Sequence, residues 1–296
     1  MDRLCHSRAA MPRPRDGAAL RFLYHTSLGR LLLKPLCARP ISRLCGRFLD
    51  SPLSKPLIRP FVRKNGIRLE DFFSDDFRCF NDCFTRKIRP ELRPVDPAAD
   101  ALVAPCDGLL SVYPIQGDAV IPAKQSVYTV RDLLGGDPAA ARFEGGVCLV
   151  FRLCVNHYHR YCYPDGGRPL RSGFIPGELH TVRPIALEQL PVFVRNCREY
   201  AILQTDHLGT VAQIEVGAML VGRIQNHPAP ERFERGDEKG MFLYGGSTVI
   251  LLIEPGKLRI PGEAFDLART GAELPVQMGE RIADVLPADD ASRRPA

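Results

Sequence analysis

The side chains best placed for self-directed chemistry lie in Gly245-Gly246-Ser247-Thr248, which precedes an apolar run ending at Pro255. Two glycines allow backbone conformations closed to other residues, and this leaves the Gly246 carbonyl accessible to the neighbouring Ser247 hydroxyl. A hydroxyl at its ordinary pKa is a weak nucleophile, so this attack needs a base. The same tetrapeptide before a strand is also typical of a simple hairpin turn.

Two further segments could supply a base or an acid. Asp107 lies in the stretch 104–108 (APCDG), where a turn opens a strand, and its simplest interpretation is a solvated turn carboxylate. The stretch 156–162 (NHYHRYC) follows the apolar run CLVFRLCV and holds two histidines, two tyrosines and an arginine. Such residues at a strand end suit a site lining better than a core, although a capped strand with surface histidines is the alternative.

The elements that must position these residues are short strands. Alternating or continuous apolar runs separated by glycine turns predict strands at 109–115, 146–155, 201–205, 211–224 and 247–255. We therefore predict an α+β fold, a β-rich barrel-like or sandwich-like catalytic domain with helices on its N-terminal side.

The N-terminal part differs from the rest in charge. Residues 1–66 hold 14 Lys or Arg and three Asp, a net charge of +11, while the remainder sums to −5. We predict a mobile tail over 1–19, a basic helical region over 20–95 and the catalytic domain over 96–296. The helical pieces, which we expect to be broken by prolines, either lie in a bilayer interface or pack on the main domain.

The cysteines and the hydropathy pattern indicate the kind of cellular compartment in which the protein works. The ten cysteines form no CxxC pair, and no stretch approaches the roughly 18 apolar residues of a membrane span. We expect reduced thiols in a cytosolic compartment. Cys79 and Cys83 have no histidine nearby, so we expect packed thiols and no metal site.

A stripe of phenylalanines predicts a helix ahead of the catalytic domain. Phe73, Phe77, Phe80 and Phe84 recur at steps of four, three and four, so one helix would carry them on one face. Ser74 and its neighbour Asp75 suit the start of this helix, and the stripe is typical of a core contact.

In combination, these residues resemble the phosphatidylserine decarboxylase family, in its shorter bacterial form. The resemblance runs from about Cys79 to the C-terminal region. It rests on CFNDCFTRKI-RPELRPV, APCDG, YHR, TVRPIAL, REYAIL, EVGAMLVGRI and RGDEKGMFLYGGSTVILL, which occur in the order and spacing of that family.

The resemblance implies self-processing of an inactive precursor. Ser247 would attack the carbonyl of Gly246, and β-elimination from the resulting ester would separate a large chain, 1–246, from a small chain, 247–296. The serine remnant would become a pyruvoyl group, and the two chains would stay together as a heterodimer. The aspartate carried over from the family is Asp107, which would support a histidine as in a serine-protease triad.

The histidine is where this sequence departs from the family. Relatives commonly carry YHRxH, whereas the second position here is Cys162, a thiol that stays largely protonated near pH 7. Either His159 is the base, or another histidine enters the site. His180 is our candidate for that replacement, and His157 is a weaker one.

The implied reaction converts phosphatidylserine to phosphatidylethanolamine. The pyruvoyl carbonyl would hold the headgroup amine as a Schiff base, and His159 would protonate the carbon left by carbon dioxide, so no added cofactor is implied. The basic leader would hold the enzyme peripherally on an anionic membrane, at the cytoplasmic side of the cell membrane.

Two other functions remain open at this point. One is a pyruvoyl-dependent decarboxylase of a soluble amino acid, against which the basic leader argues. The other is a non-catalytic β-rich membrane-binding module, which has no use for Asp107, His159 and the Gly-Gly-Ser-Thr motif together. Nucleic-acid binding is not expected, because the basic segment lacks a recognition motif and interleaved stacking aromatics.

Overall fold

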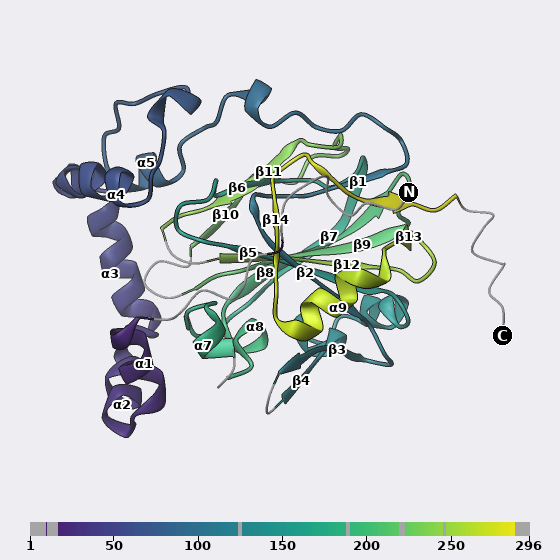
Figure 1. The fold of residues 1–296 in the computed structure, drawn as a ribbon, viewed down its shortest axis with the longest axis horizontal. Coiled ribbons are helices and arrows are strands. Elements are labelled where there is room, and N and C mark those ends of the chain that lie inside the picture. The colour runs from purple at the N-terminus through teal and green to yellow at the C-terminus, as the bar shows by residue number, and fades with distance from the viewer. Residues whose placement is uncertain are drawn as a thin grey trace.

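The computed structural model describes residue 10 and residues 17–123, 126–187, 190–218, 223–244 and 247–287. A column of N-terminal helices stands beside a β-rich body (Figure 1). Most of the predicted tail, 1–19, falls outside the described residues, and the first helix begins at Ala18. No helix in the described part of the chain is long and apolar enough to cross a membrane.

Short helices make up the N-terminal column and decorate the body. Pro40 and Pro60 lie in the first turns of α3 and α4, where the missing N–H has no intrahelical acceptor and proline costs little. The predicted N-terminal helices are therefore confirmed, with these two prolines starting helices. The helices are α1 (Ala18–His25), α2 (Ser27–Leu36), α3 (Arg39–Leu49), α4 (Ile58–Lys64), α5 (Phe80–Phe84), α6 (Val130–Leu133), α7 (Pro184–Leu187), α8 (Val192–Arg195) and α9 (Gly262–Thr270), with 3-10 turns η1 (Pro52–Leu57), η2 (Leu69–Asp71), η3 (Pro90–Leu92) and η4 (Pro138–Phe143).

Within the described ranges, the strands form one large sheet and three small ones. The strands are β1 (Ala101–Val103), β2 (Gly108–Pro114), β3 (Ala119–Ala123), β4 (Ser126–Thr129), β5 (Val147–Leu153), β6 (Arg160–Cys162), β7 (Gly167–Ile175), β8 (Arg198–Thr205), β9 (Thr210–Val216), β10 (Ile224–Asn226), β11 (Glu238–Phe242), β12 (Ser247–Ile253), β13 (Leu258–Arg259), β14 (Leu274–Val276) and β15 (Arg281–Val285).

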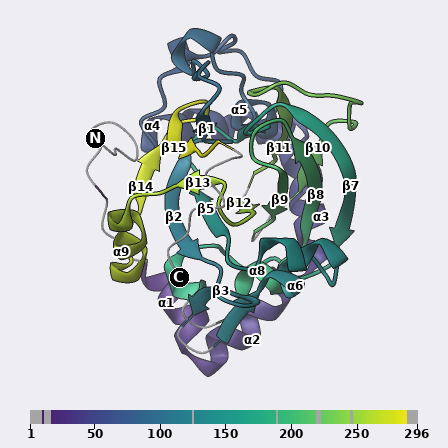
Figure 2. The same ribbon diagram turned by 90° about the vertical axis from the view of Figure 1, so that its right-hand side faces the viewer.

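The large sheet is antiparallel, with the order β14-β2-β5-β12-β9-β8-β7. It curves strongly, so that β7 and β14 face each other across the view in Figure 2. Smaller sheets have the orders β10-β11-β6, β1-β15-β13 and β3-β4. The predicted α+β class is confirmed. Among the described residues the large sheet ends in two edge strands, so no closed barrel is formed.

Both faces of the large sheet are buried. The central strand β12 contacts a hydrophobic core on each face, and this explains its continuous apolar sequence. Ile250 and Leu252 point into one core, which they share with Tyr24 of α1 and with the small helices. Val249 and Leu251 point into a second core, shared with the small sheets. Side chains alternate between faces along a strand, so a strand buried on both faces needs a continuous apolar run.

The predicted phenylalanine helix is wrong in its length. Only α5 is helical, starting at Phe80, while Phe73 lies outside it and is 57 % exposed. Ser74 explains the difference, since its hydroxyl bonds within the turn 74–76 instead of capping a helix. Phe77, Phe80 and Phe84 do share a buried cluster, as the stripe predicted.

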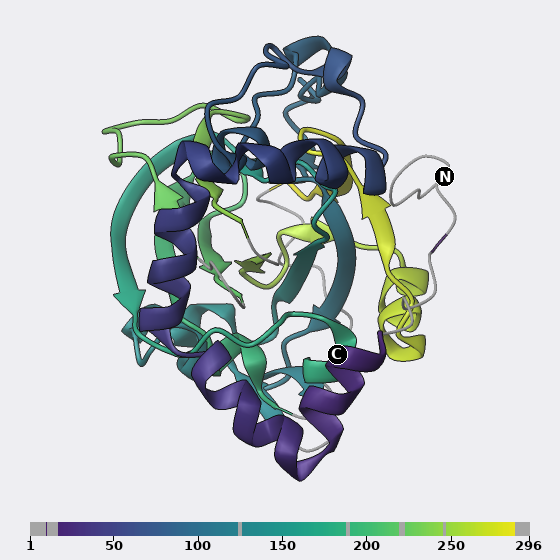
Figure 3. The ribbon, with the colours of Figure 1, turned by 90° about the vertical axis from the view of Figure 1, so that its left-hand side faces the viewer.

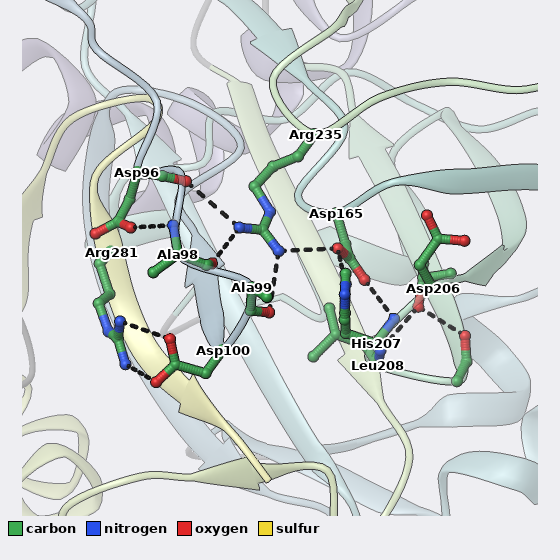
Figure 4. A network of polar contacts seen from close by, with 12 residues as sticks. Asp96, Ala98, Ala99, Asp100, Asp165, Asp206, His207, Leu208, Arg235 and Arg281 are labelled. Atoms are coloured by element: carbon green, nitrogen blue, oxygen red, sulfur yellow. Dashed lines mark hydrogen bonds and ion pairs between the residues drawn. The ribbon is translucent and has the colours of Figure 1, made fainter. Parts of the chain in front are cut away.

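A network of hydrogen bonds and ion pairs holds residues 96–100, which follow the helical region, on the β-rich body (Figure 4). Arg235 donates to the carbonyl of Ala98 at 2.5 Å and to the carboxylate of Asp165 at 3.2 Å. Asp165 is buried and also lies 2.9 Å from Nδ1 of His207. Asp100, at the end of the same segment, forms an ion pair with Arg281 on β15. Residues 96–100 are therefore held on the β-rich body at several points.

Candidate active site

Ser247 is the first residue of the central strand, where β12 pairs with Leu153 at the end of β5. Its side chain is 1 % exposed, and its Oγ has no hydrogen-bond partner among the described residues. A buried polar group without a partner costs about 1–3 kcal/mol, which makes this hydroxyl a candidate reactive group. The predicted partner in cleavage, Gly246, lies outside the described residues.

Asp107 lies at the same end of the sheet as Ser247. Leu109 on β2 pairs with Arg152 on β5, and the next residue of β5 pairs with Ser247. Strand β5 lies between β2 and β12, and neighbouring strands are about 4.8 Å apart. The backbones of Asp107 and Ser247 are therefore roughly 10 Å apart. The strand register therefore brings two of the predicted site residues to one sheet edge.

The carboxylate of Asp107 is held by a residue that the sequence did not single out. Arg93 donates to both of its oxygens, Nε to Oδ1 at 2.7 Å and Nη2 to Oδ2 at 2.6 Å, and the N–H of Met278 donates to Oδ1 at 3.0 Å. A bidentate arginine fixes the orientation of a carboxylate. Arg93 lies in the RPELRPV stretch, but no periodic pattern marks its pairing with Asp107.

His157 lies in the loop that follows β5. Its Nδ1 accepts a hydrogen bond from the N–H of Cys154 at 3.2 Å, one residue beyond the strand partner of Ser247. Burial lowers the pKa of His157, and the negative charge of Asp107 opposes this shift. The structure thus places this imidazole in the electrostatic neighbourhood of Asp107.

His159 is fully buried and presents a free acceptor. Its Nδ1 lies 2.9 Å from the carbonyl oxygen of His157, so Nδ1 carries the proton, while Nε2 has no partner among the described residues. Burial, followed by the charges of Arg86 and His157, holds the pKa of His159 well below its usual range. The centroid of the His159 ring lies 4.0 Å from that of Phe84, and the Phe84 centroid lies 5.1 Å from that of Tyr244. A neutral imidazole therefore lies beside the segment that leads into Ser247.

His180 is held by other partners. Its Nε2 lies 2.8 Å from the carboxylate of Glu178, and its Nδ1 lies 3.3 Å from the Tyr24 hydroxyl and 3.4 Å from the Cys37 thiol. Burial lowers the pKa of His180, although Glu178 opposes the shift. Both ring nitrogens thus have partners, and in the described part of the chain no hydrogen bond or ion pair joins the ring to Ser247.

Asn196 connects the His180 segment to the reactive end of the sheet. This fully buried amide donates to the carbonyls of His180 and Gly217, each at 2.7 Å. Gly217 directly follows Val216, which pairs with Thr248. Asn196 could not be identified from the sequence, because its partners lie 16 and 21 residues away with no pattern between them.

Cys162 is the residue at which this sequence departs from the YHRxH pattern. The side chain is fully buried, and this burial raises the pKa of its thiol to about 12. A thiol in that state stays protonated at neutral pH and is a poor base. This placement leaves the histidines as the candidate bases.

Comparison with known proteins identifies the family. The family model described as phosphatidylserine decarboxylase matches residues 80–284. The chain is 39 % identical over 266 residues to phosphatidylserine decarboxylase proenzyme 2 of Clostridium acetobutylicum, covering 90 % of this chain and 91 % of that protein. It is 37 % identical to the phosphatidylserine decarboxylase proenzyme of Clostridium perfringens (90 % and 93 % covered) and to that of Ruminiclostridium cellulolyticum (91 % and 92 % covered).

These matches confirm the family predicted from the sequence motifs. The residues matched by the family model include Asp107, His159 and Ser247. The chain belongs to the phosphatidylserine decarboxylase family, a family of carboxy-lyases.

Proposed function

We propose that this protein is a phosphatidylserine decarboxylase that is made as a proenzyme and forms phosphatidylethanolamine. The observation that carries the proposal is the Ser247 hydroxyl, buried and unpartnered among the described residues at the first position of the central strand. It shares its sheet edge with Asp107, and His159 lies beside the segment that leads into it. The relatives named as proenzymes support a function that begins with cleavage of the chain.

Self-cleavage accounts for a serine in this position. The Ser247 oxygen attacks the Gly246 carbonyl carbon, the peptide C–N bond breaks, and the Ser247 nitrogen takes a proton as it leaves as an amine. A base then removes the Ser247 α-proton, and the Gly246 carboxylate leaves by β-elimination. Tautomerisation and hydrolysis of the remaining enamine release ammonia and leave a pyruvoyl group on residue 247. The products are the chains 1–246 and 247–296.

The unpartnered hydroxyl of Ser247 suits formation of the pyruvoyl group, and the neighbouring side chains suit decarboxylation on that group. A pyruvoyl group supplies an electron sink for decarboxylation of an amino acid headgroup. His159 can accept a proton at Nε2, because burial keeps its imidazole neutral and no described residue occupies that nitrogen. Asp107, held in a bidentate ion pair by Arg93, lies at the same end of the sheet.

We propose His159 as the base for Ser247. Its free Nε2 distinguishes it from His180, whose two nitrogens have partners. In His159→Ala we expect the chain to remain uncut, and in His180→Ala we expect normal cleavage. If both variants are cut normally, the base is a different group, and His157 beside Asp107 becomes the leading candidate.

The N-terminal helices fit contact with a membrane surface. Many of their large apolar side chains are exposed, including Leu28 at 59 %, Leu44 at 68 % and Leu53 at 77 %. An apolar helix face edged by basic residues suits a peripheral position on an anionic bilayer. This supports a lipid substrate over a soluble amino acid, and we propose the cytoplasmic side of the cell membrane as the location. Flotation with anionic vesicles tests the contact, and a protein that ignores them contradicts it.

Intact-mass measurement tests the proposed function directly. We expect two polypeptides, with the small one carrying a mass at its first residue that differs from serine, and release of carbon dioxide from phosphatidylserine. Ser247→Ala should give one continuous chain with no activity. Active material that consists of a single polypeptide with an unmodified Ser247 would overturn the proposal.

A further inference from the structure

A cavity of about 360 Å³ lies between α3 and the edge of the large sheet. One wall is formed by α3 and includes Arg43 and Arg47, and the facing wall includes Glu199 of β8 and Arg223 next to β10. Figures 2 and 3 both place α3, in purple, alongside these strands. The cavity is thus built jointly by the N-terminal helices and the catalytic domain.

Positive charge dominates the cavity. Arg43 and Arg47 are one helical turn apart, and neither side chain has a polar partner in the part of the chain that the structure describes. Arg223 has a partial partner in Asp50, at 3.2 Å. The carboxylate of Glu199 already accepts a hydrogen bond from Asn226 at 2.7 Å. Like charges one turn apart repel each other, and an anion bound between them would relieve this repulsion.

The cavity lies next to the segment that precedes Ser247. Leu243 is part of its lining, and the Leu243 N–H donates to the Arg223 carbonyl at 3.0 Å. Asn81 is also part of the lining, and its amide oxygen accepts from the Tyr244 N–H at 3.1 Å. Four residues of chain span at most roughly 14 Å, so the cavity is within that reach of Ser247.

The outer face of α3 indicates where a ligand would enter. Ile41, Leu44 and Phe48 are exposed at spacings of three and four, so they share one face of α3. A phospholipid whose acyl chains stay in the bilayer beside these residues would present its phosphate at the level of Arg43 and Arg47. Guanidinium groups match the geometry of phosphate oxygens and form charge-assisted hydrogen bonds with them.

We propose that Arg43, Arg47 and Arg223 bind the phosphodiester of the phospholipid substrate in this cavity, and so position its headgroup toward Ser247. The proposal rests on the proposed function for the identity of the lipid. It assigns to α3 a role in substrate recognition in addition to contact with the membrane.

Calorimetric binding of monomeric short-chain phosphatidylserine tests the proposal independently of catalysis, since it can also be measured on uncleaved Ser247→Ala protein. The test variant is Arg43→Gln/Arg47→Gln. The matched control is Arg59→Gln/Arg63→Gln, which removes two exposed arginines with the same spacing from α4, outside the cavity. Both variants lose the same net charge, so long-range attraction falls equally in each.

We expect the test variant to bind short-chain phosphatidylserine at least about tenfold more weakly, because charge-assisted hydrogen bonds are lost, and the control to bind like the wild type. In active protein the same variant should raise KM about tenfold with little change in kcat. Glycerophosphoserine and inorganic phosphate serve as further probes. Equal binding in the test and control variants, or wild-type binding of inorganic phosphate alone, would overturn the proposal. Failure of the wild type to cleave or decarboxylate while these binding results hold would instead count against the proposed function.

Discussion

Lys239 and Glu215 form a buried ion pair that joins the large sheet to the small sheet beside the active site. Nζ of Lys239 on β11 lies 2.8 and 2.9 Å from the two carboxylate oxygens of Glu215 on β9. It also donates to Asn226 on β10 at 3.0 Å. Both charged side chains are buried, at 5 % and 0 % exposure. We predict that Lys239→Met strongly destabilises the protein, because the Glu215 carboxylate loses its counter-charge.

The magnitude follows from the burial of the pair. Removing one partner of a buried ion pair costs about 3–5 kcal/mol. Unfolding entropy of about 2.1 cal/mol/K per residue gives roughly 0.6 kcal/mol/K for 296 residues, so Tm should fall by roughly 5–8 °C. Burial already raises the pKa of Glu215, and loss of Lys239 raises it further. A folded-state pKa above the unfolded value means that stability is lost as pH rises, so the deficit should be larger at pH 8 than at pH 5.

Thermal unfolding followed by circular dichroism measures this effect, in a Ser247→Ala background in which we expect a single chain. Glu215→Gln and the double variant Lys239→Met/Glu215→Gln complete a double-mutant cycle. We expect the double variant to recover at least about 2 kcal/mol relative to the sum of the single losses. A loss below about 1 kcal/mol in Lys239→Met, or strictly additive losses, would refute the reasoning.

Two further predictions concern stability and the N-terminal helices. Arg171 donates to Asp137 and holds the pKa of that carboxyl at about 2. The stability contributed by this ion pair is therefore present above the unfolded pKa and is lost as pH falls toward 2. Arg171→Gln should cost up to about 1 kcal/mol of unfolding free energy at pH 7 and almost nothing near pH 2, which urea midpoints at both pH values would reveal. In Gly29→Ala, the added Cβ would lie 2.0 Å from the Phe22 carbonyl oxygen, so α1 should separate from α2 and limited trypsin digestion should cut near Arg21 faster; an unchanged rate would contradict this packing.

Strands and candidate site residues could be predicted because their signals are local. The apolar run of β12 marks a strand buried on both faces, and Ser247 at its start follows from the Gly-Gly-Ser-Thr motif. The phenylalanine stripe predicted burial for Phe77, Phe80 and Phe84, but its helical period extended over Phe73, where the turn at Ser74 prevents a helix.

Long-range pairings could not be predicted. Arg93 reaches Asp107 across 14 residues, and Asn196 reaches Gly217 across 21, with no periodicity connecting the partners. The arginines of α3 gave only an amphipathic pattern in the sequence, because their role depends on how α3 packs against β8. Each of these contacts is fixed by tertiary packing and leaves no local trace.

The position of β12 has a consequence for any break in the backbone before Ser247. This strand is hydrogen-bonded on one side to β5 and on the other to β9, and all seven of its residues are buried. A fragment that begins there cannot leave without exposing two cores at once. The two pieces should therefore survive dilution and gel filtration as one particle, and pieces synthesised apart should fail to assemble when mixed.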